Sequence, residues 1–346
     1  MPLAALFASH TPLKDYLDPG PGVAAEVAGV LDAARAFVRA FAPEVVIEFA
    51  PDHFNGFFYR LMPSFCIGAA AESIGDWKTI PGPLNVDGAL AQQLVEAAHA
   101  DGVDVALSHR MEVDHGFTQL LEILFEPGTA PPLVPVFINC AAPPRPPMRR
   151  VQALGAAIGR VIAGSRQRVL LLASGGLSHD PPVPLLDGAP PAVRERIIAG
   201  GRLTPEARAA REDNVLREGQ RFANASSERT PLNPTWDRSF LDALEAGQLD
   251  SLAALDDADI TRAAGAGGHE VRAWLAAAAA LAAAGPYQAR RLYYRPIDPW
   301  IAGFAVTVAR SGNQSGGATT VHTIERQRHE LQREYQHTAS RRSGRQ

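Results

Sequence analysis

Short aliphatic runs alternate along the chain with longer stretches that have the period of a helix. The runs are six or seven residues long: "LAALFAS", "EVVIEFA", "VDVALS", "LVPVFIN" and "RVLLLAS". Stretches such as 22–41 and 147–163 lie between them and are long enough for helices. Strands that alternate with helices favour a parallel sheet covered by helices. We therefore expect an α/β fold, layered α/β/α, around a central, largely parallel or mixed sheet.

The second half of the chain is predicted to be mainly helical. Residues 186–230 are rich in Arg, Glu and Ala, which predicts solvent-facing helices. Residues 231–285 contain "GAGGHE", a glycine-rich turn before an alanine-rich helix. From residue 311 onward the sequence is polar, with few apolar residues. The expected organisation is a folded domain over 1–310 and a disordered tail over 311–346.

Composition argues against several classes of partner. A formal net charge of -4 gives no reason to expect nucleic acid. The longest apolar run, "WLAAAAALAAAG", is too short to cross a bilayer, which requires about 20 residues. Two cysteines, Cys66 and Cys140, cannot form a disulfide framework and suit a reducing compartment. With no basic leader at the N-terminus, we expect a cytoplasmic protein that binds neither nucleic acid nor membrane.

Four histidines stand in a similar setting. They occur in "LFASHTP", "EFAPDHFNG", "MEVDHGF" and "LLASGGLSHDPP", as His10, His53, His115 and His179. Three of them follow a clear apolar run closely. Ligands of open α/β sheets bind beyond the carboxyl ends of the strands, so these imidazoles can meet although they are far apart in sequence. The active site is therefore expected at those ends, where clustered imidazoles favour metal binding, proton transfer or both.

A non-heme Fe(II) site also needs a carboxylate beside two histidines. Glu270 in "GAGGHEVRAW" follows the glycine-rich turn and begins a helix, where a carboxylate is favourable. Spacing alone does not choose between Glu270 and three aspartates, Asp52, Asp114 and Asp180. Each aspartate stands next to a histidine and could orient it instead of binding metal.

A series of ordered motifs makes the chain resemble the type III extradiol ring-cleavage dioxygenases. The similarity runs over roughly residues 1–308. Its motifs are "SHTPL", "FAPDHFNGFFY", "MPSFCIG", "VDHGF", "PVFIN", "GGLSHDPPVP", "LNPTWD", "HEVRAW", "YYRPI" and "PWIAGF". The folded domain over 1–310 is then a catalytic domain. The resemblance also implies a homo-oligomer.

The resemblance implies an Fe(II) ion held by His10, His53 and Glu270. It assigns proton donation to His115 and proton acceptance to His179. The implied reaction cleaves a catechol such as 3-(2,3-dihydroxyphenyl)propionate between C1 and C2 with O2. The product is 2-hydroxy-6-oxonona-2,4-dienedioate, and the setting is aromatic degradation.

The binding site for the substrate side chain is open in the sequence. A propionate would bind near a cation, and Arg295 or Arg60 could supply it. The aromatic run Phe57, Phe58 and Tyr59 could line the catechol pocket.

Two other functions use the same residue types. Histidines with a carboxylate also suit a zinc-dependent hydrolase with an activated water. A non-catalytic, Memo-like binding protein is the other alternative on this fold.

Overall fold

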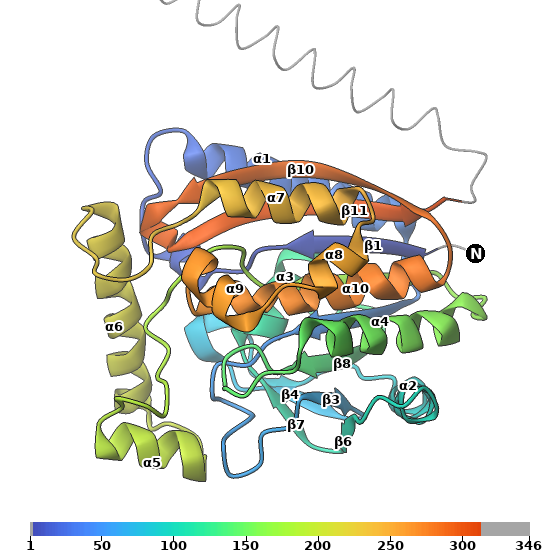
Figure 1. Cartoon of the computed structure of the whole chain (residues 1–346), viewed down its shortest axis with the longest axis horizontal. Helices are drawn as coiled ribbons and strands as arrows, with labels where there is room; N and C mark the ends of the chain where they lie inside the picture. The colour runs from blue at the N-terminus through green and yellow to red at the C-terminus, as the bar shows by residue number, and fades with distance from the viewer. Residues whose placement is uncertain (1–2, 313–346) are drawn as a thin grey trace, which may run out of the picture. The chain divides into compact units, whose positions relative to one another are not determined.

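An eight-stranded mixed sheet forms the centre of the protein (Figure 1). The computed structural model describes residues 3–312, and the strand order is β10-β11-β1-β9-β2-β8-β3-β6. The strands are β1 Leu3–Ala8, β2 Val45–Ala50, β3 Phe65–Gly68, β6 Ala106–Ser108, β8 Leu133–Ile138, β9 Val169–Ser174, β10 Tyr287–Ile297 and β11 Ala302–Ser311. A second sheet has the order β5-β4-β7, with β4 Ala71–Ser73, β5 Gly82–Pro83 and β7 Met111–Val113.

The four central strands β1, β9, β2 and β8 run parallel. Their carboxyl ends therefore lie at one edge of the sheet. The outer strands are partly antiparallel, because β11 pairs with β1 and β10, and β3 pairs with β8, in the opposite direction. The predicted α/β class with a largely parallel or mixed sheet is confirmed, and the sheet is mixed. Strands β10 and β11 were not among the predicted strands, and Arg and Tyr interrupt the apolar pattern of β10.

Helices cover both faces of the sheet (Figure 1). Alternate strand residues face opposite layers: Phe7 belongs to the core under α10 and α4, and Leu6 to the core under α1. The first face carries α2 Gly88–Ala100, α4 Met148–Ala163, α7 Pro234–Glu245, α8 Leu249–Ala253 and α10 Val271–Ala283. The second carries α1 Val23–Phe41 and α3 His115–Leu124. The remaining α-helices are α5 Pro191–Ala199, α6 Pro205–Ala223 and α9 Asp257–Ala264.

Glycines allow α4 and α10 to approach each other at backbone distance. A Cβ atom at Gly155 would lie 2.1 Å from the carbonyl oxygen of Ala276, and one at Gly159 would lie 2.2 Å from that of Ala280. No side chain fits there unless the helices separate. Because α10 begins directly after Glu270, this packing also fixes the helix that carries the candidate carboxylate.

The predicted helical content of 186–285 agrees with the structure, but the predicted exposure of 186–230 was wrong in part. Helix α6 buries Phe222 and contributes to a pocket described below. The turn "GAGGHE" ends in a 3-10 helix, η3, at Gly267–Glu270. None of the helices in the described residues combines the length and apolar character that a membrane span requires. Apart from its first two residues, the predicted tail over 311–346 lies outside the described residues.

We predict that Gly155→Ala lowers the free energy of unfolding by about 1–3 kcal/mol, because the new methyl group overpacks the α4–α10 contact. The matched control is Gly29→Ala, in the middle of α1, where a Cβ atom meets nothing within 4 Å. That change should leave stability unaltered or raise it by up to about 1 kcal/mol. Chemical denaturation of the two variants measures the difference, and equal effects would contradict the close approach.

Candidate metal centre and proton-transfer site

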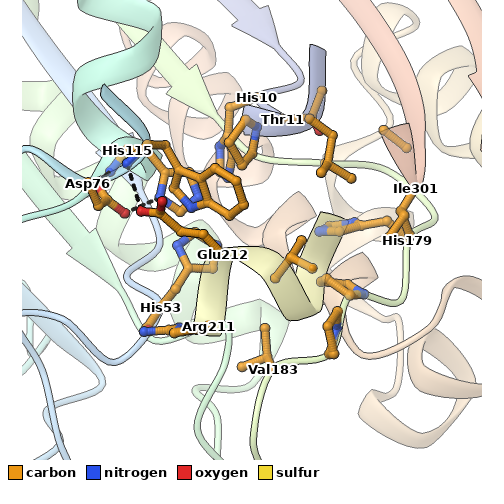
Figure 2. Close-up of a pocket in the computed structure, with 18 of the residues that line it drawn as sticks. His10, Thr11, His53, Asp76, His115, His179, Val183, Arg211, Glu212 and Ile301 are labelled. Carbon is orange, nitrogen blue, oxygen red and sulfur yellow. Dashed lines mark hydrogen bonds and ion pairs between the residues drawn. The ribbon is translucent and has the colours of Figure 1, made fainter. Parts of the chain in front are cut away.

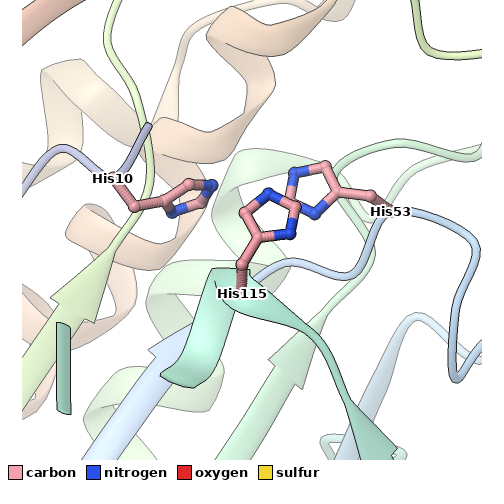
Figure 3. Close-up of side chains that lie close together, drawn as sticks. All are labelled: His10, His53 and His115. Carbon is pink, nitrogen blue, oxygen red and sulfur yellow. The ribbon is translucent and has the colours of Figure 1, made fainter. Parts of the chain in front are cut away.

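The carboxyl edge of the parallel strands brings the four predicted histidines together. His10 follows β1, His53 follows β2 and His179 follows β9, while His115 is the first residue of α3. The ring centroid of His10 lies 5.4 Å from that of His53 and 5.5 Å from that of His115. Figure 3 shows these three imidazoles facing one another from different segments. Residues more than a hundred positions apart therefore share one site.

The carboxylate of Glu270 lies among these imidazoles. Its Oε1 atom is 3.2 Å from Nε2 of His53 and 3.3 Å from Nε2 of His179. Its Oε2 atom is 3.7 Å from Nε2 of His10 and accepts a 2.7 Å hydrogen bond from the backbone N–H of Gly176. Burial alone would raise the pKa of Glu270, but the imidazoles and hydrogen bonds outweigh it and hold the pKa well below its usual value.

Two neighbouring groups orient His10 and His53. Nδ1 of His53 donates to Oδ2 of Asp114 at 3.0 Å, and Nδ1 of His10 lies 3.0 Å from the hydroxyl of Ser174. Nε2 of each ring consequently faces Glu270. Burial lowers the pKa of His10 to about 3, with three nearby imidazoles adding to the shift and Glu270 opposing it. His10 is therefore a neutral imidazole, the form that binds metals.

The donor set fits a metal ion bound by two imidazoles and a carboxylate. His10, His53 and Glu270 are all buried, with exposed fractions of 7%, 8% and 4%. Two histidines and one carboxylate that leave further coordination positions open are typical of non-heme Fe(II) sites. The structure therefore offers the residues that such an ion requires.

A different trio, His10, His53 and His115, offers one ligand atom each, all within 4.8 Å of one another. The rings of His53 and His115 are stacked, however, at a centroid distance of 4.5 Å and an interplanar angle of 15°. An imidazole lone pair lies in the plane of its ring, so two stacked rings do not direct their lone pairs at one ion. Ring orientation favours Glu270 over His115 as the third ligand.

His115 and His179 have their Nδ1 atoms occupied. Nδ1 of His115 donates to Oδ2 of Asp76 at 2.6 Å, and Nδ1 of His179 donates to the carbonyl of Leu177 at 2.9 Å. Because both acceptors fix the proton on Nδ1, Nε2 is the nitrogen of each ring that can exchange a proton with a ligand. Burial lowers the pKa of His179, but Glu270 outweighs it and the net pKa is raised.

A glycine makes the position of His179 possible. A Cβ atom at Gly267 would lie 2.2 Å from Nε2 of His179. Any other residue in this part of η3 would collide with the ring. The "GAGGHE" turn therefore serves to bring the backbone close to His179 as well as to start the helix after Glu270.

The suggestion that an aspartate could orient the histidine next to it in the sequence was wrong for Asp52, Asp114 and Asp180. Asp52 accepts hydrogen bonds from the backbone N–H groups of residues 55–57 and so shapes the loop after β2. Asp180 likewise accepts from the backbone N–H groups of residues 230 and 266. Adjacent side chains in an extended loop point apart, which explains both results.

The groups that do orient histidines come from other segments. Asp114 bonds His53 rather than its neighbour His115, and it also accepts from the backbone N–H of His53 at 2.9 Å. Asp76 accepts hydrogen bonds from both Nδ1–H and the backbone N–H of His115. Asp76 was not among the residues predicted from the sequence, and it stands in "GDWK" with no histidine nearby. Its role depends on the pairing of β4 with β7, which no local pattern reports.

A pocket of about 850 Å³, open solvent included, surrounds the histidines and Glu270. Helix α6 forms part of its wall, and Figure 2 shows Arg211 and Glu212 on that helix near His53 and Asp76. Apolar side chains, among them Trp77 and Val183, line the rest.

The three aromatic residues suggested from the sequence to line the catechol pocket lie outside it. Phe57 stacks on Phe137 at 3.8 Å, and Phe58 and Tyr59 pack in a separate apolar cluster, so none of the three lines the pocket. The two cations considered for a substrate side chain do not line it either. Arg295 forms an ion pair with a glutamate on α1, and Arg60 is exposed.

Residues 4–305 match the family model described as "Catalytic LigB subunit of aromatic ring-opening dioxygenase". A protein of Dechloromonas aromatica (strain RCB) named 2,3-dihydroxyphenylpropionate/2,3-dihydroxicinnamic acid 1,2-dioxygenase 1 is 52% identical over 301 residues, which is 87% of this chain and 96% of that protein. A protein of Paraburkholderia xenovorans (strain LB400) is named as a dioxygenase of the same two compounds. It is 53% identical over 301 residues, which is 87% of this chain and 95% of that protein. Residues 4–305, which match the family model, include the four histidines of the site and Glu270.

We predict that Asp114→Asn lowers the affinity for a divalent metal by about 10- to 100-fold, because it removes the charge that holds His53 in place. The matched variant is Asp76→Asn, which removes the same group from His115. Its metal affinity should remain within about threefold of the wild type, because Glu270 rather than His115 completes the site. Anaerobic calorimetric titration with Fe(II) measures both, and an equal loss would instead support His115 as a ligand.

Proposed function

This chain belongs to the family of the catalytic LigB subunit of aromatic ring-opening dioxygenases, and we propose that it is an Fe(II)-dependent extradiol dioxygenase of carboxylated catechols. The proposed substrate is 3-(2,3-dihydroxyphenyl)propionate, which the names of relatives at about half identity include. Cleavage between C1 and C2 with O2 gives 2-hydroxy-6-oxonona-2,4-dienedioate. The observation that carries the proposal is the buried Glu270 carboxylate within 3.7 Å of three imidazoles inside the family-matched region.

His10, His53 and Glu270 are the proposed ligands of the iron. Each is buried, the Nδ1 atoms of both rings are anchored, and Nε2 of both rings faces the carboxylate. When bound, Fe(II) supplies a Lewis acid that eases ionisation of the catechol and a site where catechol and O2 can meet. The orientation of the three side chains is set by Ser174, Asp114 and the Gly176 N–H before any ligand arrives.

His179 is the proposed proton acceptor. The carbonyl of Leu177 holds its Nδ1–H, so Nε2 faces the pocket and can receive a phenolic proton. His115 is the proposed proton donor later in the reaction. Asp76 fixes its ring and tautomer, so that a proton on Nε2 is directed at the substrate. In this proposal one imidazole accepts a proton and a different imidazole donates one.

Three further expectations from the sequence accompany this function. We propose that residues 1–310 are the catalytic domain, that the enzyme is a homo-oligomer, and that it works in the cytoplasm. The two cysteines, Cys66 and Cys140, are both free and buried, which is compatible with a reducing compartment.

We predict that the Fe(II)-loaded protein consumes O2 with 3-(2,3-dihydroxyphenyl)propionate and forms a yellow product, and that it does neither with protocatechuate. Chelation should abolish turnover and Fe(II) should restore it. Oxygen-electrode and absorbance assays under anaerobic metal loading measure both. Turnover with Zn²⁺ but not with Fe(II) would instead support a hydrolase and would sink the proposal.

We predict that His115→Ala and His179→Ala each lower kcat by about 10²–10⁴-fold, the usual effect of losing a general acid or base. Their Fe(II) affinity should stay near that of the wild type, since neither residue is a proposed ligand. His109→Ala, at an exposed histidine outside the cluster, is the control. Full activity in both site variants would argue for a protein that binds iron without this proton transfer.

A further inference from the structure

Five carboxylate or guanidinium side chains line the pocket, and four of them have strong partners. Asp76 bonds His115, Glu212 accepts from the backbone N–H of Trp77, and Glu270 lies among the imidazoles. The fourth, Arg211, donates to the carbonyl of His53 and to the side chain of Asn55 at 3.2 Å. The fifth is Arg208, and it differs from the others.

Arg208 has one weak polar contact within the described part of the chain. Its Nη1 atom lies 3.4 Å from the carbonyl oxygen of Ile74, and it forms no ion pair with any described residue. A guanidinium has five N–H donors, so most of its hydrogen-bonding capacity is unused. Of the two arginines that line the pocket, Arg208 therefore has more unused donors.

The position of Arg208 separates it from the metal ligands along α6. Arg211, three residues later, lies against the loop that carries His53. Residues three apart share a helix face, and the rise places Arg208 about 4.5 Å along the axis from Arg211 toward the N-terminal end of α6. A ligand with one end at the histidines and an anionic arm could therefore reach Arg208.

The apolar residues of the pocket would strengthen an ionic contact at Arg208. Trp77, Leu203 and Val215 line the same pocket, and apolar walls exclude water from a bound ion pair. Arg208 also lies near enough to Arg211 for the two charges to repel each other. An anion placed at Arg208 would relieve that repulsion as well as fill its free donors.

We propose that Arg208 binds the side-chain carboxylate of the catechol substrate and selects carboxylated over uncharged catechols. This inference rests on the proposed function for the identity of the ring, since the arm must be attached to a catechol held at the histidines. A planar guanidinium can accept a carboxylate in a bidentate pair, which adds direction to the charge attraction. In this proposal the cation that binds the arm is Arg208 and not Arg295 or Arg60, the two considered from the sequence.

The first test measures substrate preference in Arg208→Met, which keeps a flexible, unbranched side chain and removes the guanidinium and its charge. The substrates are 3-(2,3-dihydroxyphenyl)propionate and 3-propylcatechol, in which a methyl group replaces the carboxylate. The ratio of kcat/KM for the acid to that for 3-propylcatechol should fall by about 10- to 100-fold, mainly through KM. Arg208→Lys should recover part of the ratio.

A control on the same helix separates charge recognition from helix stability. Arg217→Met alters an exposed arginine of α6 that does not line the pocket, and it should leave the ratio at the wild-type value. Equal losses on both substrates in Arg208→Met would show that Arg208 only supports the Ile74 loop. That result, like wild-type kinetics on both substrates, leaves the ratio unchanged and would overturn the inference.

A second test does not need turnover. 3-Phenylpropionate carries the arm but lacks both hydroxyl groups, and its binding can be followed by the fluorescence of Trp77 and Trp300, which line the pocket. Arg208→Met should weaken this binding by about tenfold or more. If the wild type and Arg208→Met bind it equally, the inference fails even if catechols are cleaved. If no catechol is cleaved but binding depends on Arg208, the proposed function fails and the carboxylate site stands.

Discussion

The buried carboxylate of Glu270 is the group on which the arrangement of the site depends. A carboxylate that is almost wholly removed from water is costly unless positive or hydrogen-bonding groups surround it. Here the partners come from the ends of β1, β2 and β9. The start of α10 is also fixed to the end of β9, because Trp274 donates to the carbonyl of Gly175 and Gly176 donates to Glu270. The site can therefore form only where sheet and helix meet.

The meeting of the histidines was predictable, and the groups that orient them were not. Parallel strands share a carboxyl edge, so a local pattern of strand followed by His10, His53 or His179 was enough to place three imidazoles. Asp76 reaches His115 only because β4 pairs with β7, a contact between distant segments. The sequence alone also left Glu270 level with three aspartates, and only the family resemblance chose among them. The wall formed by α6 was missed because its charged residues resemble an ordinary solvent-facing helix.

Helix α6 connects the proposed site for the substrate arm with His115, the proposed proton donor. Arg208 and Glu212 both contact the backbone of the loop at residues 74–78, through the carbonyl of Ile74 and the N–H of Trp77. The same loop carries Asp76, which orients His115. A change at the far end of the substrate can thus be transmitted to the reacting end through contacts that are already in place. Enzymes use remote binding energy in this way to improve the alignment of reacting groups.

The position of β1 in the sheet determines when the site can be assembled during synthesis. The strand that delivers His10 precedes the other described strands in the sequence, yet its two neighbours are β9 and β11, and Ser9 donates to the carbonyl of Gly303. Most of residues 3–311 must therefore leave the ribosome before β1, which precedes His10, can pair with both β9 and β11. Pairings between such distant segments form late and slowly. The nascent chain consequently carries separated histidines, and the candidate metal centre can form only after β11 has been synthesised.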